Sequence, residues 1–255
     1  MAAVARTESE RLLFVLDACC DVSDPALEGV VAMAARLDAA LEGLFVEDAQ
    51  LLLASQLPFA TEIGRAGRER VLEPASLRQA YEHASASLAR RLQHSAAARN
   101  VRWKLTQAAG SRLAAVIEAA QDQDLLLAAR AARMRPALSA PAAYRRVCLL
   151  YEREAALERA LNVLGALAAN GHTREVLLYA RHAPPPTLLE RLRAAGLRTY
   201  TQLADEEAPG ARLRTASTLG AGLLIAPRAL LAGIPPSTRE GRVIETLSVP
   251  LLLLR

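Results

Sequence analysis

Two stretches of the sequence share one pattern, RLLFVLD at residues 11–17 and RVCLLYE at residues 146–152. Each has an arginine, then five mostly apolar residues and then an acid, which is typical of a buried strand ending at a polar edge. Each is followed by a turn and by the tripeptide Ala-Leu-Glu, which begins at Ala26 in the first case and at Ala156 in the second. The repeat predicts two equivalent strand–helix units and therefore two tandem domains.

Apolar periodicity assigns the rest of the chain to alternating strands and helices. The first half predicts a helix with apolar positions from Leu27 to Leu41, a strand at 43–48, an irregular stretch near 57–64, a helix from Leu77 to Leu92, a strand at 101–107, a helix starting at Gly110-Ser111 and a strand at 124–129. The second half predicts a strand at 146–151, a helix at 153–169, a strand at 174–180, a short helix after Pro186, a weak strand at 197–203, a helix near 208–219, a strand at 222–226 and a final strand at 249–255.

Strands that alternate with helices of this length imply right-handed crossovers and a parallel sheet covered on both faces. The predicted fold class is therefore α/β, with two tandem doubly wound, Rossmann-like domains at 1–140 and 141–255. The first domain is expected to lack a fifth strand. A counterpart of the final strand at 249–255 would have to lie between the strand at 124–129 and the second domain, where too few residues are present.

The composition argues against several classes of protein. No apolar run approaches the roughly 20 residues that span a bilayer, and the first residues, MAAVARTESERLL, contain no hydrophobic signal core. We therefore expect a cytoplasmic protein without a membrane partner. The three cysteines, Cys19, Cys20 and Cys148, form no C-x-x-C pair and are odd in number, so reduced thiols are expected rather than disulfides or a zinc ribbon.

Neither nucleic-acid binding nor catalysis is indicated. The net charge of +4 comes from scattered arginines, and only 4% of residues are aromatic, too few to stack bases along a basic surface. The four histidines make no metal-ligand spacing, so no metal is expected. The sequence contains no G-x-S-x-G elbow, phosphate loop or dinucleotide fingerprint. We predict that the protein is not an enzyme.

Taken together, these features resemble the universal stress protein family, in its tandem two-domain form. The resemblance covers nearly the whole chain. Four stretches carry it: RLLFVLD with Asp17 closing the first strand, GLFVEDAQLLLASQLPFATEIG at 43–64, AAGSRLAAVIEAAQDQDLLLAA at 108–129, and LSVPLLLLR at 247–255, which is similar to the closing C-P-V-hydrophobic strand of the family. The resemblance implies a stress-response or regulatory protein that works through protein contacts.

Many members of that family bind ATP with an acid at the end of the first strand and a loop of the form G-x2-G-x9-G-[ST] after the fourth. Asp17 matches the acid, and Glu152 is a longer substitute in the second domain. Both loops depart from the pattern, since residues 129–140 read ARAARMRPALSA and residues 226–238 read APRALLAGIPPST. Glycines in such loops bring backbone N–H groups against phosphate. The sequence therefore predicts degenerate sites and the loss of ATP binding, with no cofactor.

One alternative is an ATP or AMP sensor. In it, Asp17 holds the ribose, the backbone near Val46 contributes to the site, and Arg130, Arg133 and Arg135 replace the glycine N–H groups as an anion clamp. The competing interpretations are that Asp17 only caps its turn and that the arginines form a basic linker.

Two further alternatives concern the thiols and the assembly. Cys19 and Cys20 follow Asp17 in a loop, where a lowered thiol pKa would allow a redox switch. Otherwise they are passive thiols.

The strand at 249–255 is expected to form a cross-domain or cross-subunit contact, most plausibly in a homodimer. The reason is that an uncovered edge of the strand DLLLAA would invite aggregation. The other possibility is that this strand only completes its own sheet, while the linker shields that edge.

Overall fold

The computed structural model describes residues 10–17, 24–63, 67–110, 118, 125–128, 144–152, 157–169, 173–205, 208–232, 247 and 249–255. The strands of the main sheet are β1 (Arg11–Asp17), β2 (Ala40–Asp48), β5 (Trp103–Gly110), β6 (Leu125–Ala128), β7 (Arg146–Tyr151), β8 (Glu175–Ala180), β9 (Arg198–Leu203), β10 (Leu223–Pro227) and β11 (Leu251–Leu254). The helices are α1 (Asp24–Arg36), α2 (Ala49–Ala54), α3 (Pro74–Ala97), α6 (Leu157–Ala169), α7 (Pro186–Ala194), α8 (Pro209–Thr218) and α9 (Ala229–Ala232). A separate two-stranded hairpin consists of β3 (Thr61–Ile63) and β4 (Glu69–Val71).

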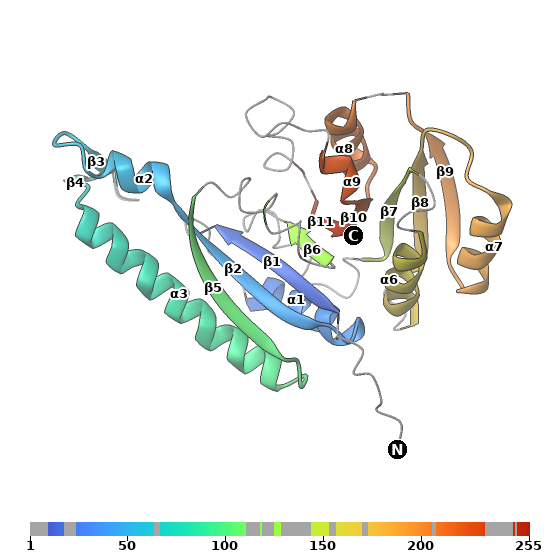
Figure 1. Ribbon diagram of the computed structural model, residues 1–255, viewed down its shortest axis with the longest axis horizontal. Coiled ribbons are helices and arrows are strands. Elements are labelled where there is room, and N and C mark those ends of the chain that lie inside the picture. The colour runs from blue at the N-terminus through green and yellow to red at the C-terminus, as the bar shows by residue number, and fades with distance from the viewer. Residues whose placement is uncertain are drawn as a thin grey trace, which may run out of the picture.

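One sheet runs through the described parts of both halves of the chain, in the order β5-β2-β1-β6-β11-β10-β7-β8-β9 (Figure 1). Counted along the chain within each half, the strands lie in the same order from the outer edge of the sheet inward: third, second, first, fourth. This order is β5-β2-β1-β6 on one side and β9-β8-β7-β10 on the other. Every pairing within these two sets is parallel. Residues 11–17 and 146–151 therefore occupy equivalent positions in the two sets of strands, but the two sets belong to one continuous sheet and not to the two separate sheets that the tandem prediction implied. That Asp17 superposes on Glu152 stays a prediction.

Both faces of the sheet are buried, because successive side chains of a strand point to opposite sides. In β1, Leu12 belongs to a first core and Leu13 to a second, and in β11 Leu252 and Leu251 divide in the same way. Each core contains residues from both halves of the chain. The near-continuous apolar strands of the sequence are explained by this burial on two sides.

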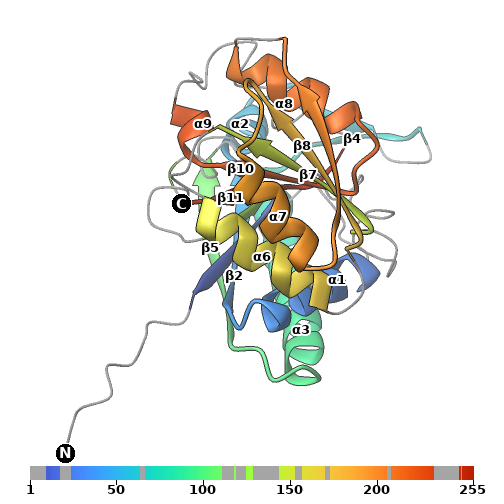
Figure 2. The same cartoon turned by 90° about the vertical axis from the view of Figure 1, so that its right-hand side faces the viewer.

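Helices cover the two faces as the predicted α/β class requires. Side chains of α1, α3, α6 and α7 pack into the first core, and those of α8 and α9 pack into the second. Figure 2 shows these two groups of helices on opposite sides of the strands. The parallel, doubly wound arrangement is therefore present around β7–β10. The helix predicted from Ser111 lies outside the described residues, apart from Glu118.

The last strand joins the two halves. β11 pairs in parallel with β10 and in antiparallel with β6, where Leu252 lies opposite Leu127. The expected cross-domain contact of residues 249–255 is thus confirmed within one chain, and the alternative that this strand only completes its own sheet is wrong. Because both edges of β11 are already paired, this strand cannot add a second copy of the sheet. The homodimer itself stays a prediction.

Helix α1 is shorter than the apolar spacing predicted, because Leu41 lies in β2 rather than on the helix. The helix ends at Arg36, and the chain turns at Asp38, whose φ of 50° is left-handed. Aspartate tolerates this conformation better than most residues. The sequence contains no glycine at this turn to indicate where the helix ends.

The stretch expected to be irregular near 57–64 directly follows α2 and contains the short strand β3, so the prediction was wrong for residues 61–63. Asp48 caps α2, since its Oδ1 accepts hydrogen bonds from the backbone N–H groups of Gln50 at 2.9 Å and Leu51 at 3.1 Å. The chain then enters the β3–β4 hairpin, which is closed at its base by the N–H of Leu72 donating to the carbonyl of Ala60 at 2.9 Å. Short elements such as these give too little periodicity to be recognised in a sequence.

The joining role of β11 gives a test of the sheet. Leu252→Ala is expected to lower the free energy of unfolding by about 2–5 kcal/mol, because the side chain is fully buried in the first core. The control Leu203→Ala, on the edge strand β9 and half exposed, is expected to change it by less than about 0.5 kcal/mol. Urea unfolding measures both values, and equal effects would contradict the central position of β11.

Candidate functional site

The carboxyl ends of the first parallel strands bring two predicted site residues together. Asp17 is the last residue of β1, and its Cα lies opposite that of Val46 in β2. The side chain of Val46 is buried in the second core, so only its backbone is available to a ligand. The structure thus places the two residues side by side, as the sensor alternative requires. Their binding role stays a prediction, because the described atoms do not include the Asp17 side chain.

The arginines of the predicted anion clamp, Arg130, Arg133 and Arg135, lie outside the described residues. The same holds for Cys19 and Cys20, the thiols of the separate redox-switch alternative. The anion clamp and the redox switch therefore stay predictions.

In the second half, the acid at the end of the repeated sequence pattern is already paired. Glu152 directly follows β7, and its Oε1 accepts a hydrogen bond from Nη1 of Arg212 on α8. The arginine side chain is 6% exposed and that of the glutamate is 31% exposed, so the cation is the buried partner. Burial lowers the pKa of Arg212, as expected for a charge taken out of water. Its Nε is buried and has no hydrogen-bond partner in the described structure.

A pocket opens beside this ion pair, at the carboxyl ends of β7, β10 and β11. The space between its walls, open solvent included, is about 260 Å³, and the walls include Leu149, Tyr151, Glu152, Leu157, Pro227 and Leu254. The enclosed part of this space is far smaller than the roughly 300–1,000 Å³ of pockets that hold drug-sized ligands. The one charged group on the wall is the carboxylate that Arg212 holds. In its described part, the pocket offers a nucleotide little room and no cation.

Cys148 lies in the middle of β7 and is fully buried in the second core. Burial raises the pKa of its thiol to about 12, because the thiolate would lose its hydration. A thiol with this pKa stays protonated at neutral pH and is a poor nucleophile.

Two other classes of feature are absent from the described ranges. Within them, no three histidine, cysteine, aspartate or glutamate side chains gather closely enough to hold a metal ion. No helix in those ranges combines the length and the apolar character needed to cross a membrane.

Arg212 is a site residue that the sequence analysis missed. It precedes the buried Leu213 and lies one helical turn before the buried Ala216. Residues four apart lie on the same face of a helix, so the spacing to Ala216 was a usable signal. The partner was not visible in the sequence, because Glu152 and Arg212 are 60 residues apart.

The comparisons with known proteins support the fold. The chain resembles the crystal structure of a universal stress protein from Archaeoglobus fulgidus DSM 4304, with a TM-score of 0.55 and 13% sequence identity, over 95% of this chain and 96% of that chain. At this identity the likeness shows a shared fold, so the chain has an α/β fold like that of universal stress proteins. No protein-family profile matches the sequence, and no curated protein matches it.

The burial of Cys148 can be tested in a variant that carries Cys19→Ser and Cys20→Ser, in which Cys148 is the one remaining cysteine. In the native state its remaining thiol is expected to resist a chromogenic disulfide reagent at pH 8 and to react fully in urea. Between about pH 9 and 12 the folded state keeps a proton that the unfolded state has lost, so the free energy of unfolding should fall as pH rises through this range. Rapid modification of the native protein would contradict the buried position.

The Glu152–Arg212 pair predicts an asymmetric effect on stability. Glu152→Ala leaves a buried guanidinium without a counter-charge and is expected to cost about 3 kcal/mol. Arg212→Met should cost less, because water can reach the partly exposed carboxylate that remains. A double-mutant cycle in urea measures both values and their coupling. Equal costs, or no coupling, would show that the two side chains do not pair.

Proposed function

We propose that this chain is a tandem two-domain protein of the universal stress protein type in which the nucleotide sites have degenerated. In this proposal it acts in the cytoplasm as a non-enzymatic regulatory or stress-response protein, through contacts with other proteins. The domains are residues 1–140 and 141–255. The tandem interpretation rests on the strand order shared by β5-β2-β1-β6 and β9-β8-β7-β10, together with the repeat in the sequence.

The observation that carries the loss of nucleotide binding is the ion pair between Glu152 and Arg212. An acid that binds a ribose must offer its oxygens to the sugar hydroxyl groups. Here one oxygen accepts a hydrogen bond from a buried guanidinium. A nucleotide that took this carboxylate would leave Arg212 buried without its counter-charge, which is strongly unfavourable.

The end of β10 adds a second argument. In the resembled family, a glycine-rich loop follows this strand and supplies backbone N–H groups to phosphate. β10 ends instead in Ala226 and Pro227, and proline has no N–H to donate. Pro227 also lines the small pocket beside Glu152. Both features favour a site that no longer holds a triphosphate.

The absence of enzyme activity is part of the same proposal. It is supported by the missing nucleophile and phosphate motifs in the sequence, and by the protonated, buried state of Cys148.

Thermal melting with and without millimolar Mg-ATP tests the loss of binding. A ligand at 100 times its Kd stabilises a native protein by about 2.7 kcal/mol, which corresponds to a rise of several degrees in Tm. We expect no rise. The adjacency of Asp17 and Val46 makes the sensor alternative specific to the first half, so Asp17→Ala is the matched variant. A rise in Tm that Asp17→Ala abolishes would establish the sensor instead.

A further inference from the structure

Strand β9 is an open edge of the main sheet. It pairs with β8 on one side and is the outermost strand of the described sheet, at the end opposite β5 (Figure 1). The N–H of Arg198 donates to the carbonyl of Arg174 at 2.8 Å, so the even-numbered residues of β9 bond to β8. Because the bonds of a parallel pair recur at every second residue, the N–H and C=O groups of Thr199, Thr201 and Leu203 face outward. No described strand pairs with these groups.

β9 lacks the features that usually protect an edge strand, which are lysine, proline, a bulge or a covering element. It reads RTYTQL, with Arg198 as its one charged residue, and its register with β8 is continuous. Helix α7 contacts β9, yet Thr201 and Leu203 are exposed. On the other face Tyr200 is 47% exposed. Both the backbone and the side chains of this edge are therefore accessible to an added strand.

The charges beside this edge indicate which kind of strand is complementary to it. Arg146 of β7, Glu175 of β8 and Arg198 of β9 lie in one row across the sheet, and residues in register share a face. Arg146 holds Glu175, since its Nε and Nη2 lie 2.9 Å and 2.8 Å from Oε2 of the glutamate. No carboxylate of the described residues pairs with Arg198. The row of base, acid and base is continued best by an acid on the next strand.

The next row on the same face is apolar. Tyr200 lies two residues after Arg198 and in register with Leu177 of β8. The guanidinium of Arg146 lies over its ring, with Cζ 5.9 Å from the ring centroid, and this attraction stabilises the position of the ring. An aromatic ring on a sheet packs well against a large apolar side chain of the neighbouring strand. A complementary strand thus carries an acid and a large apolar residue two positions apart.

We propose that β9 binds an extended segment of a partner protein, which adds to the sheet as its next strand. The segment places an acidic side chain opposite Arg198 and a large apolar side chain opposite Tyr200. Its backbone bonds to the outward groups of Thr199, Thr201 and Leu203 and provides affinity, while the two side chains provide specificity. A second copy of β9 does not supply the acid, because RTYTQL contains none. The inference rests on the proposed function, since it assigns a surface to the contacts with other proteins.

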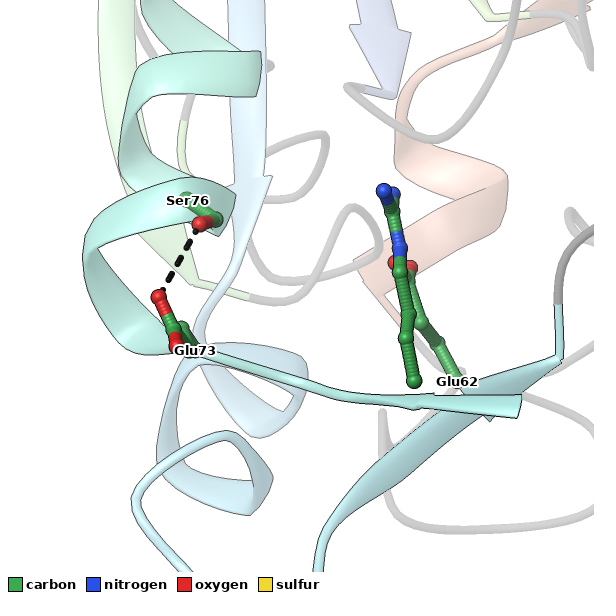
Figure 3. A network of polar contacts seen from close by, with 4 residues as sticks. Glu62, Glu73 and Ser76 are labelled. Carbon is green, nitrogen blue, oxygen red and sulfur yellow. Dashed lines mark hydrogen bonds and ion pairs between the residues drawn. The ribbon is translucent and has the colours of Figure 1, made fainter. Parts of the chain in front are cut away.

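A charge swap tests the proposal on the full chain. The probes are two fluorescein-labelled peptides, STTEVFTTS and its counterpart STTKVFTTS, and fluorescence anisotropy measures both Kd values. The wild-type chain is expected to bind the glutamate peptide about tenfold more tightly than the lysine peptide, and Arg198→Glu is expected to reverse this preference. The matched control is Arg68→Glu, which makes the same change of charge at an exposed arginine in the separate β3–β4 hairpin (Figure 3). It should leave the preference unchanged.

A proline variant tests the backbone contact. Thr201→Pro removes an outward N–H and leaves the pairing with β8 intact, so it should weaken binding of the glutamate peptide about tenfold without a change in Tm. Gln202→Pro removes an N–H that faces β8 and should lower Tm instead.

Three outcomes would overturn the proposal. The wild-type chain could fail to prefer the glutamate peptide, Arg198→Glu could keep the wild-type preference, or Thr201→Pro could abolish a dimer of the chain, which would make a second copy the occupant. The proposed function is tested separately, because a rise in Tm with Mg-ATP contradicts the degenerate nucleotide sites and does not bear on peptide binding at β9.

Discussion

The antiparallel pairing of β11 with β6 is the contact on which the rest of the structure depends. It places the last strand of the chain between the two halves, with Leu251–Leu254 buried on both faces of the sheet. Each core then continues from one half to the other without an interruption. Arg159 on α6 adds a polar contact across the junction, since its Nε lies 3.5 Å from Oε1 of Glu10. A strand edge that would otherwise invite aggregation is thereby covered from within the chain.

The strands at this junction are buried and serve the fold, so binding to a ligand or partner has to use other parts of the molecule. The carboxyl ends of parallel strands are the usual ligand sites of doubly wound proteins. In the described part of the second half, that position holds the Glu152–Arg212 ion pair and a small pocket. Most of the large exposed apolar residues lie elsewhere, on α2, on the β3–β4 hairpin and between them. Our proposal of a protein that works through surface contacts rests on this arrangement, because a fold alone does not determine a function.

Much of the fold could be predicted from local sequence. The repeat at residues 11–17 and 146–152 identified the two equivalent strands, because a strand buried on both faces needs an almost continuous apolar run. The weaker signals failed where elements were short or lacked a glycine or proline, as at the Asp38 turn and in the β3–β4 hairpin. The candidate site was only partly predictable. Asp17 and Val46 lie side by side, as the sensor alternative assumed, but their binding role stays a prediction. Arg212 was missed.

The sequence by itself determined the α/β class, the succession of strands and helices along each half of the chain and the acids at the strand ends. These follow from apolar periodicity and from polar residues at the ends of strands, which act over a few neighbouring residues. Only the tertiary structure decided that β11 joins both halves, that Arg212 neutralises Glu152 and that the β3–β4 hairpin leaves Ile63 and Val71 in solvent. Each of these depends on residues tens of positions apart, or on the absence of a covering neighbour. Such contacts form because they bury apolar surface or pair charges in three dimensions, and a local sequence pattern does not predict them.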